Sequence, residues 1–174
     1  MSSVPGSAST ARLFIALWPD PAIRHALRAR RDCWAWPRGA SPVDAAKLHL
    51  TLHFLGAIPT ERVPDLQAGL ALPFTPFSLS LGIPTLWPHG IAVLEPHAQP
   101  PELLQLHAYL SDALVALGLT PEARSFRPHV TLARRAKHAV VPPEAEKLVW
   151  DIDSYALVQS TPDNGGYTVL RAYR

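Results

Sequence analysis

The sequence predicts an α+β fold with mixed or antiparallel sheets, and three patterns support this prediction. Residues 77–81 alternate apolar and polar side chains, as a half-buried strand does. Residues 101–117 place leucines three and four positions apart, which is the spacing of an amphipathic helix. Residues 162–166 read Pro-Asp-Asn-Gly-Gly between two apolar segments, which is typical of a hairpin turn. Strand and helix patterns alternate along the chain, but tight hairpins disfavour a purely parallel sheet.

The elements of the first half are bounded by proline and glycine. Asp20-Pro21 predicts the start of a helix, because aspartate is a good N-cap and proline is tolerated at the first helical position. Gly56 is expected to end a strand, and Pro64 fits a second helix because it lies in the opening turn. The elements expected here are a strand over 12–17, a helix over 21–31, a loop over 34–46, a strand over 48–55 and a helix over 60–72.

The second half of the chain combines short strands with one long helix. The helix over 101–117 is the clearest element, and Gly118 directly after it is expected to stop it. The turn at 162–166 divides the last two strands. The strands expected here run over 77–81, 91–94, 130–133, 153–159 and 167–173.

Length and composition indicate one soluble domain. The chain has 174 residues, of which 48% are hydrophobic and 17% charged, so it can bury a core and is too apolar to be disordered throughout. We expect residues 1–10 to form a disordered tail and residues 11–174 to form a single domain. Nothing in the sequence requires more than a monomer.

Several classes of protein are disfavoured by what the sequence lacks. Its one cysteine, Cys33, allows no intrachain disulfide and no cysteine-based zinc site. No stretch approaches the roughly 18 consecutive apolar residues of a membrane helix. The first ten residues carry no secretion signal, so we expect a cytoplasmic protein without a membrane partner. The net charge of +2 is too small to indicate nucleic-acid binding by itself.

One four-residue pattern occurs twice in the chain. It reads His49-Leu50-Thr51-Leu52 in the first copy and His129-Val130-Thr131-Leu132 in the second. Residues two apart on a strand share a face, so each copy presents one imidazole and one hydroxyl to one side and its apolar residues to the other. A single histidine on a strand is often structural, but the duplicated pattern favours a functional pair.

If the two copies face each other across a groove, that groove holds the groups needed for metal-free phosphoryl chemistry. One neutral imidazole can take a proton from water while the other, protonated, gives one to the leaving oxygen, and the hydroxyls hold the phosphate. A metal site is the main alternative, because His53 is expected on the same face as His49. Four strand residues span about 13 Å, too far for both histidines to bind one ion. We therefore expect no metal.

Four blocks of sequence carry a resemblance to a known family. They are Arg-Leu-Phe-Ile-Ala-Leu at 12–17, Leu-His-Leu-Thr-Leu-His-Phe-Leu-Gly at 48–56, Phe-Arg-Pro-His-Val-Thr-Leu-Ala-Arg at 126–134 and Tyr-Ala-Leu-Val-Gln-Ser at 155–160. With these blocks the chain resembles the two-histidine (2H) phosphoesterase superfamily and, within it, the bacterial RNA 2′,3′-cyclic phosphodiesterases, also called 2′-5′ RNA ligases. The resemblance implies a bilobal fold, in which two pseudo-symmetric sheet lobes with flanking helices surround a central cleft.

The resemblance also implies an activity, the opening of an RNA 2′,3′-cyclic phosphate to a 2′-phosphate without metal or nucleotide cofactor, with 2′-5′ RNA ligation as the reverse reaction. His49 would protonate the departing 3′-oxygen and His129 would activate water, with the order of the two roles left open. Thr51 and Thr131 would hydrogen-bond the phosphate oxygens, and Arg134 would clamp the phosphate through its guanidinium fork. The partner would be RNA with cyclic phosphate ends, for example tRNA halves.

Four other residues each have a site role and an ordinary role open to them. Phe14 can stack a terminal base or belong to the core, and Trp87 can face the substrate or fill a proline-rich turn. Arg127 and Lys47 can each steer RNA or remain solvated. His107 falls on the apolar stripe of the long helix and is expected to pack in the core.

Two other functions are compatible with these patterns. One keeps the site but changes the substrate to a 2′-5′-linked oligonucleotide or a small cyclic nucleotide. The other is an RNA-end binding protein without turnover. Two intact His-x-Thr motifs favour an enzyme, because binding alone does not need two titrating imidazoles.

Overall fold

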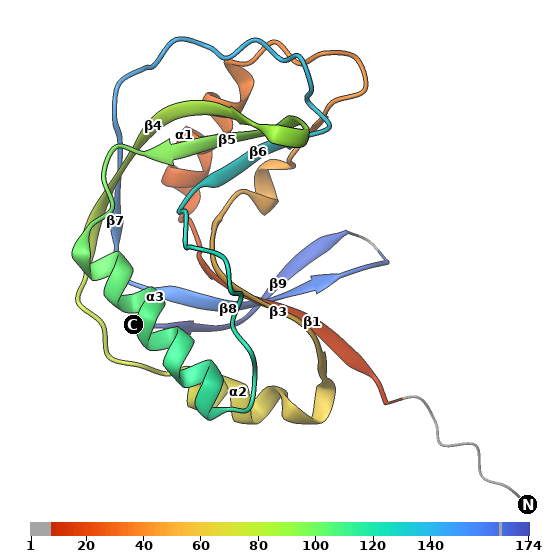
Figure 1. The fold of residues 1–174 in the computed structure, drawn as a ribbon, viewed down its shortest axis with the longest axis vertical. Helices are drawn as coiled ribbons and strands as arrows, with labels where there is room; N and C mark the ends of the chain where they lie inside the picture. The colour runs from red at the N-terminus through yellow and green to blue at the C-terminus, as the bar shows by residue number, and fades with distance from the viewer. Residues whose placement is uncertain (1–7, 164) are drawn as a thin grey trace, which may run out of the picture.

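The computed structural model describes residues 8–163 and 165–174, and these residues form one nine-stranded antiparallel sheet with flanking helices (Figure 1). The elements in chain order are β1 (Thr10–Leu17), α1 (Pro21–Asp32), β2 (Ser41–Pro42), η1 (Ala45–Lys47), β3 (Leu50–Pro59), η2 (Thr60–Arg62), α2 (Val63–Gly69), β4 (Phe77–Trp87), η3 (Pro88–Gly90), β5 (Ile91–Pro96), α3 (Pro101–Ala116), β6 (Val130–Arg134), β7 (Leu148–Ile152), β8 (Tyr155–Thr161) and β9 (Gly166–Tyr173).

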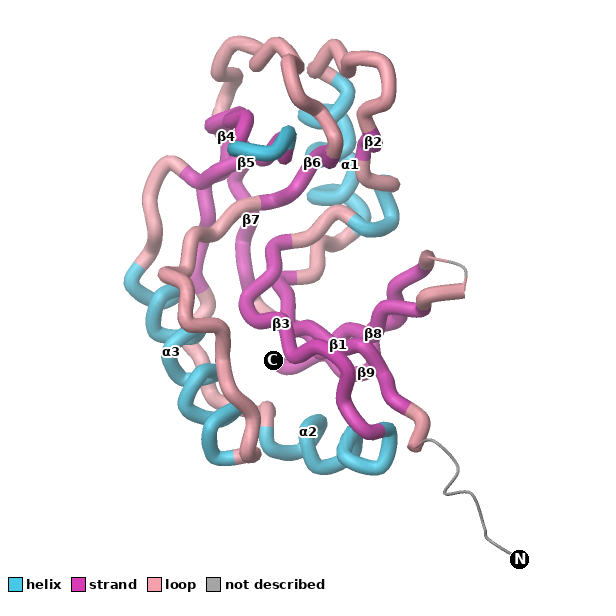
Figure 2. Tube along the Cα trace, turned by 45° about the vertical axis from the view of Figure 1, so that its right-hand side comes forward, coloured by secondary structure: helices cyan, strands magenta, loops and turns pink. Residues whose placement is uncertain are grey.

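The strand order divides this sheet into two halves. It runs β7-β4-β5-β6-β3-β1-β8-β9, and the short strand β2 pairs with β6 off this path. The halves meet where β3 and β6 pair through Leu50 and Val130. Helix α1 lies with the half that contains β6, whereas α2 and α3 lie beside the half that contains β3 (Figures 1 and 2). The expected α+β fold of two lobes is confirmed, and the two lobes share one curved sheet.

The helices form where the sequence pattern predicts them. The Asp20 carboxylate accepts a hydrogen bond from the backbone N–H of Ile23 at 2.8 Å, which caps the first turn of α1. Helix α3 buries four leucines on the side that faces the sheet, and this apolar face fixes its place (Leu103, Leu106, Leu110 and Leu114). The helix expected over 60–72 is a 3-10 turn, η2, followed by the short helix α2.

Two strands, β3 and β4, run well past their expected ends. β3 continues through Gly56, whose φ of +75° is accessible to glycine, next to a bulge where the register with β1 passes over Leu55. β4 runs on to Trp87 despite Pro84. Proline has no N–H to donate, but β7 pairs only with residues 77–81 of β4, so the edge beside Pro84 needs no donor.

The sequence patterns missed two strands. The two-residue strand β2 falls within the loop expected over 34–46. β7 pairs with β4 at the end of the sheet, and it follows a stretch rich in proline and charge that carries no alternating pattern. The expected strand over 153–159 is β8, which begins at Tyr155, and with β9 it forms the expected hairpin.

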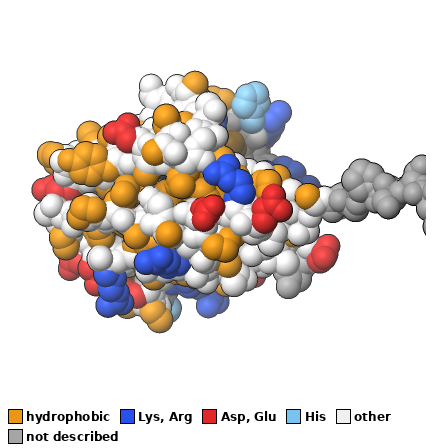
Figure 3. All heavy atoms as spheres, turned by 90° about the horizontal axis from the view of Figure 1, so that it is seen from below, with side chains coloured by type: hydrophobic (Ala, Val, Ile, Leu, Met, Phe, Trp, Pro, Cys, Tyr) orange, Lys and Arg blue, Asp and Glu red, His pale blue; other side chains and the backbone are white. Residues whose placement is uncertain are grey.

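The ends and the surface complete the fold. Most of the tail expected over 1–10 lies outside the described residues, and β1 begins at Thr10. Basic and acidic side chains are interspersed on the face seen from below in Figure 3, as the small net charge suggests. Within the described ranges, no helix is both long and apolar enough to cross a membrane.

Candidate active site

The two His-x-Thr motifs lie side by side where the halves of the sheet meet. Leu50 pairs with Val130 in antiparallel register. Continuing that register by one residue in each direction sets His49 opposite Thr131 and Thr51 opposite His129. All four side chains point to the face opposite that of the buried Leu50 and Val130, and all four are half-buried. An approximate two-fold axis through the central pair thus relates the two motifs.

Each imidazole is oriented by a carbonyl two residues earlier. His49 Nδ1 lies 2.6 Å from the Lys47 carbonyl oxygen, and His129 Nδ1 lies 2.7 Å from that of Arg127. Because a carbonyl only accepts, Nδ1 carries the proton in both rings, and Nε2 is the atom that can exchange one in the neutral form. His49 Nε2 lies 2.9 Å from Thr51 Oγ1, whose hydroxyl can donate to it.

The electrostatic environment keeps both imidazoles neutral in the free protein. Burial is the main cause that lowers the pKa of His49 to about 4, with smaller contributions from Arg24, His129 and Arg134. Burial also lowers the pKa of His129, and Arg127 and Arg134 add to this, whereas Glu95 opposes it. A bound phosphate anion would raise both pKa values and allow one ring to be charged.

Aromatic rings enclose the His49 end of this site. Ring centroids lie 4.8 Å from His49 for Phe14, 5.8 Å for Trp18 and 5.5 Å for Tyr167. Phe14 is only 4% exposed, so its ring supports His49 from beneath and offers little surface to a ligand. The Lys47 ammonium lies over Tyr167, 5.5 Å from the ring centroid.

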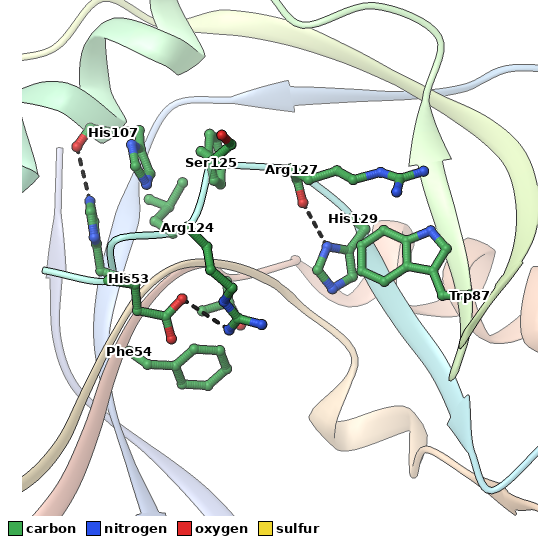
Figure 4. Close-up of a pocket in the computed structure, with 12 residues that line it drawn as sticks. His53, Phe54, Trp87, His107, Arg124, Ser125, Arg127 and His129 are labelled. Carbon is green, nitrogen blue, oxygen red and sulfur yellow. Dashed lines mark hydrogen bonds and ion pairs between the residues drawn. The ribbon is translucent and has the colours of Figure 1, made fainter. Parts of the chain in front are cut away.

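The His129 end has its own aromatic wall. Trp87 lies 4.3 Å from His129 between ring centroids, and the Arg127 guanidinium lies 4.5 Å from the Trp87 centroid (Figure 4). Sequence reasoning proposed Trp87 but missed Trp18 and Tyr167. The tripeptide Leu-Trp-Pro occurs at 17–19 and at 86–88, and each copy places its tryptophan against one of the two histidines. The repeated tripeptide is the sequence feature from which Trp18 could have been predicted as a site residue.

A β-bulge follows the threonine of each motif. In β6 the register with β5 passes from Thr131 to Ala133, so Leu132 is the extra residue. In β3 the register with β1 passes from Thr51 to His53, so Leu52 is the extra residue. An extra residue reverses the side to which the following side chains point.

The two bulges place one further residue from each motif on the face of the histidines. In β6 this residue is Arg134, which is exposed and whose charge lowers the pKa of both histidines. In β3 it is Phe54, which is 51% exposed. Sequence reasoning missed Phe54, although it stands five residues after His49 just as Arg134 stands five residues after His129.

The expectation that His53 shares the face of His49 is wrong. The bulge at Leu52 turns His53 away, toward α3, where it is 4% exposed. Its Nε2 donates to the His107 carbonyl oxygen at 2.9 Å, and the two rings stack with centroids 4.1 Å apart. His107 packs on the inner side of α3, as expected, and also reaches the wall of a cavity.

That cavity, of about 280 Å³, opens beside the His129 end of the site. Thr51, Trp87 and His129 line it, whereas His49, Thr131, Arg134 and Phe14 lie outside it. Figure 4 shows Phe54 and Arg124 reaching into the same space as His129 and Trp87. The remaining lining residues are Leu52, His53, His107, Glu122, Ser125, Phe126 and Arg127. Aromatic walls with a few polar groups are typical of a small-molecule subsite.

Among the described residues, no group of three or more histidine, cysteine, aspartate or glutamate side chains is placed to share an ion.

Comparison with known proteins agrees with this geometry. The family model described as the 2′-5′ RNA ligase superfamily matches residues 19–164. The chain is 34% identical to an RNA 2′,3′-cyclic phosphodiesterase of Thermus thermophilus, covering 93% of this chain and 89% of that protein. It is 32% identical to an RNA 2′,3′-cyclic phosphodiesterase of Escherichia coli, covering 93% of this chain and 95% of that one. The crystal structure of E. coli LigT complexed with 3′-AMP matches with a TM-score of 0.85 and 28% identity, covering 95% of this chain and 98% of that chain. The chain therefore belongs to the 2′-5′ RNA ligase superfamily.

Proposed function

We propose that this protein hydrolyses the 2′,3′-cyclic phosphate at RNA ends to a 2′-phosphate by acid–base catalysis with two histidines. The observation that carries this proposal is the two-fold arrangement of His49, Thr51, His129 and Thr131 around the Leu50–Val130 pair. Relatives at 32–34% identity over most of the chain bear the name RNA 2′,3′-cyclic phosphodiesterase, which supports the same substrate.

The reaction needs one imidazole in each protonation state. Water attacks phosphorus and loses a proton to the neutral imidazole, while the bond from phosphorus to the 3′-oxygen breaks and that oxygen takes a proton from the charged imidazole. Following the resemblance, we assign the proton donor to His49 and the base to His129. Burial opposes a charge on His49, so the substrate's phosphate anion must raise its pKa on binding.

Other residues of the face hold the substrate in this proposal. The hydroxyls of Thr51 and Thr131 hydrogen-bond phosphate oxygens, and the guanidinium of Arg134 binds two of them through its fork. The nucleobase enters the cavity and stacks on Phe54, with Trp87 forming the wall next to His129.

A comparison of single variants tests the proposal. His49→Ala and His129→Ala should each lower the rate of hydrolysis of an RNA oligonucleotide with a cyclic phosphate end by about 10²-fold or more. His25→Ala, on the exposed surface of α1, is the control and should hydrolyse at the rate of the parent. Full activity in either active-site variant would refute the assignment, and loss of RNA affinity without any activity in the parent would favour a binding protein.

The assignment of the two roles has its own test. An aryl leaving group does not need a proton, so His49→Ala should retain most of the parent activity on a nucleoside 2′-(4-nitrophenyl) phosphate, in which the aryl oxygen replaces the departing 3′-oxygen, whereas His129→Ala should not. The opposite pattern would exchange the two roles.

A second candidate substrate is a 2′-5′-linked oligonucleotide. Aromatic rings lie at both ends of the phosphate site, with Trp18 and Tyr167 near His49 and Phe54 and Trp87 near His129, so a nucleoside can be held on either side of a phosphodiester. Cleavage of a 2′-5′-linked dinucleotide, and its formation from the separated products, would establish this activity.

The proposal extends to the source of the RNA, the oligomeric state and the location in the cell. We propose tRNA halves as one source of the cyclic phosphate ends, a monomer as the active form and the cytoplasm as the compartment. Light scattering measures the oligomeric state directly, since a monomer has a mass of 19.0 kDa.

A further inference from the structure

The two catalytic imidazoles depend on carbonyl groups that are held in different ways. The carbonyl of Lys47, which orients His49, ends the 3-10 turn η1, where the N–H of Lys47 donates to Asp44 at 2.9 Å. Arg24 braces this turn from α1 by donating to the carbonyl groups of Ala45 at 2.7 Å and Leu48 at 3.0 Å. A hydrogen-bonded backbone turn, braced by the Arg24 side chain, therefore fixes the orienting group of His49.

The carbonyl of Arg127, which orients His129, has no such support from the backbone. It lies in the segment between α3 and β6, which contains no helix or strand. Across the described parts of the chain, no backbone–backbone hydrogen bond outside helices and strands involves residues 120–128. Side chains must therefore hold this segment in place.

One anchor is the side chain of Arg127 itself. Its Nε donates to Glu95 Oε1 at 2.7 Å, its guanidinium lies over Trp87, and the Thr85 hydroxyl donates to the other Glu95 oxygen at 2.8 Å. These contacts fix the guanidinium, which is separated from the carbonyl by a flexible side chain.

The other anchor is a stack of three rings that ends at the residue next to Arg127. His53 of β3 stacks on His107 of α3 with centroids 4.1 Å apart and planes at 17° (both labelled in Figure 4). His107 in turn stacks on Phe126, with centroids 4.0 Å apart and planes at 13°. The stack joins a core strand, a helix and the unsupported segment. Phe126 shares a peptide bond with Arg127, so fixing its ring restricts the position of the Arg127 carbonyl.

A hydrogen bond fixes the first ring of this stack. His53 Nε2 donates to the His107 carbonyl oxygen at 2.9 Å, so the backbone of α3 holds the His53 ring in rotation. A ring held in rotation sets the plane on which the His107 ring stacks, and through it the plane of Phe126.

We infer that His107, supported by His53, is a positioning residue that holds His129 in its catalytic orientation through Phe126 and the Arg127 carbonyl. This inference rests on the proposed function for its kinetic test and on the geometry alone for its spectroscopic test. His107 does not touch the reacting atoms, and its effect passes through His129.

The kinetic test compares three substitutions on α3. His107→Ala removes the middle ring and should lower kcat about tenfold with KM changed less than twofold, because a displaced catalytic group costs rate rather than binding. His107→Phe keeps a ring for the stack and should recover most of kcat. Leu110→Ala, one turn along the same helix and buried, is the control that loses core packing without touching the stack, and its kcat should match the parent below its unfolding temperature. Equal losses of kcat in His107→Ala and Leu110→Ala would overturn the inference.

A double variant tests whether His107 acts through His129. Adding His107→Ala to His129→Ala should cause no further loss of rate, because the imidazole to be positioned is already absent. A further tenfold loss in this background would show that His107 acts elsewhere and would contradict the inference.

The spectroscopic test does not require activity. Nitrogen NMR of the histidine side chains should report a single tautomer of His129 with the proton on Nδ1 in the parent and in His107→Phe, and a mixture of tautomers in His107→Ala. An unchanged single tautomer in His107→Ala would overturn the inference even if the parent had no phosphodiesterase activity.

Discussion

Burial of His49 predicts that the protein loses stability as the pH falls from neutral to acidic. The pKa of His49 is lowered to about 4 in the folded state, mainly by burial, whereas an imidazole in an unfolded chain has a pKa of about 6.5. Between these two values the unfolded chain binds a proton that the folded protein does not. The free energy of unfolding therefore falls with falling pH through this window and levels off below about pH 4.

The size of this effect follows from the two pKa values. Each unit of difference corresponds to about 1.4 kcal/mol, so His49 alone removes roughly 3 kcal/mol when the whole window is crossed. Between pH 7 and pH 5 its share is about 2 kcal/mol, a large part of the 5–15 kcal/mol typical of a domain.

Urea unfolding at pH 7 and pH 5 measures this share directly. In His49→Gln the fall in unfolding free energy between the two pH values should be smaller than in the parent by about 2 kcal/mol, because glutamine does not titrate. His25→Gln, exposed on α1, serves as the control and should show the same fall as the parent. An equal fall in His49→Gln and in the parent would refute the account of His49 as a buried neutral imidazole.

Three further predictions concern catalysis. The pH dependence of kcat/KM should be bell-shaped, with its lower limb near pH 4 and its upper limb below pH 6.5, because the pKa values of His49 and His129 are both lowered in the free protein. A plateau of kcat/KM that extends above pH 8 would contradict this. Arg134→Lys keeps the charge but loses the fork, so kcat/KM should fall about tenfold, and a rate equal to the parent would remove Arg134 from phosphate binding. Phe54→Ala should raise KM for RNA ends about tenfold, whereas Phe54→Tyr keeps a ring for base stacking and should leave KM near the parent value. Equal KM values in the parent and both variants would place the nucleobase elsewhere.

The fold was predictable where one local pattern determines one element. The leucine spacing of α3, the Asp20-Pro21 start of α1 and the turn before β9 each follow from short stretches of sequence, and all three are confirmed. β7 was not predictable in this way, since it is a short edge strand whose partner, β4, lies far away in the sequence. Likewise, β4 can contain Pro84 because of the way its two edges are paired in the sheet, and this pairing is not visible in the sequence.

The site was predictable as far as the repeated motif reaches. His49, Thr51, His129 and Thr131 share one face because period-two alternation holds up to each threonine. Alternation fails after the threonine, where a bulge reverses the facing of the side chains.

A bulge is a mismatch between paired strands and leaves no mark in either sequence alone. This is why His53 was placed on the wrong face and Phe54 was missed. The ring stack of His107 was missed for a different reason, because its three rings come from separate segments of the chain.

In the proposed reaction, two histidines open an RNA cyclic phosphate without help from a metal. The most direct measurement incubates the protein in excess EDTA with an RNA oligonucleotide ending in a 2′,3′-cyclic phosphate and identifies the phosphate at the product terminus. We expect a 2′-phosphate, formed at the same rate with and without EDTA. A 3′-phosphate would reverse the assignment of the leaving oxygen. No product, or strong inhibition by EDTA that zinc reverses, would contradict the claim.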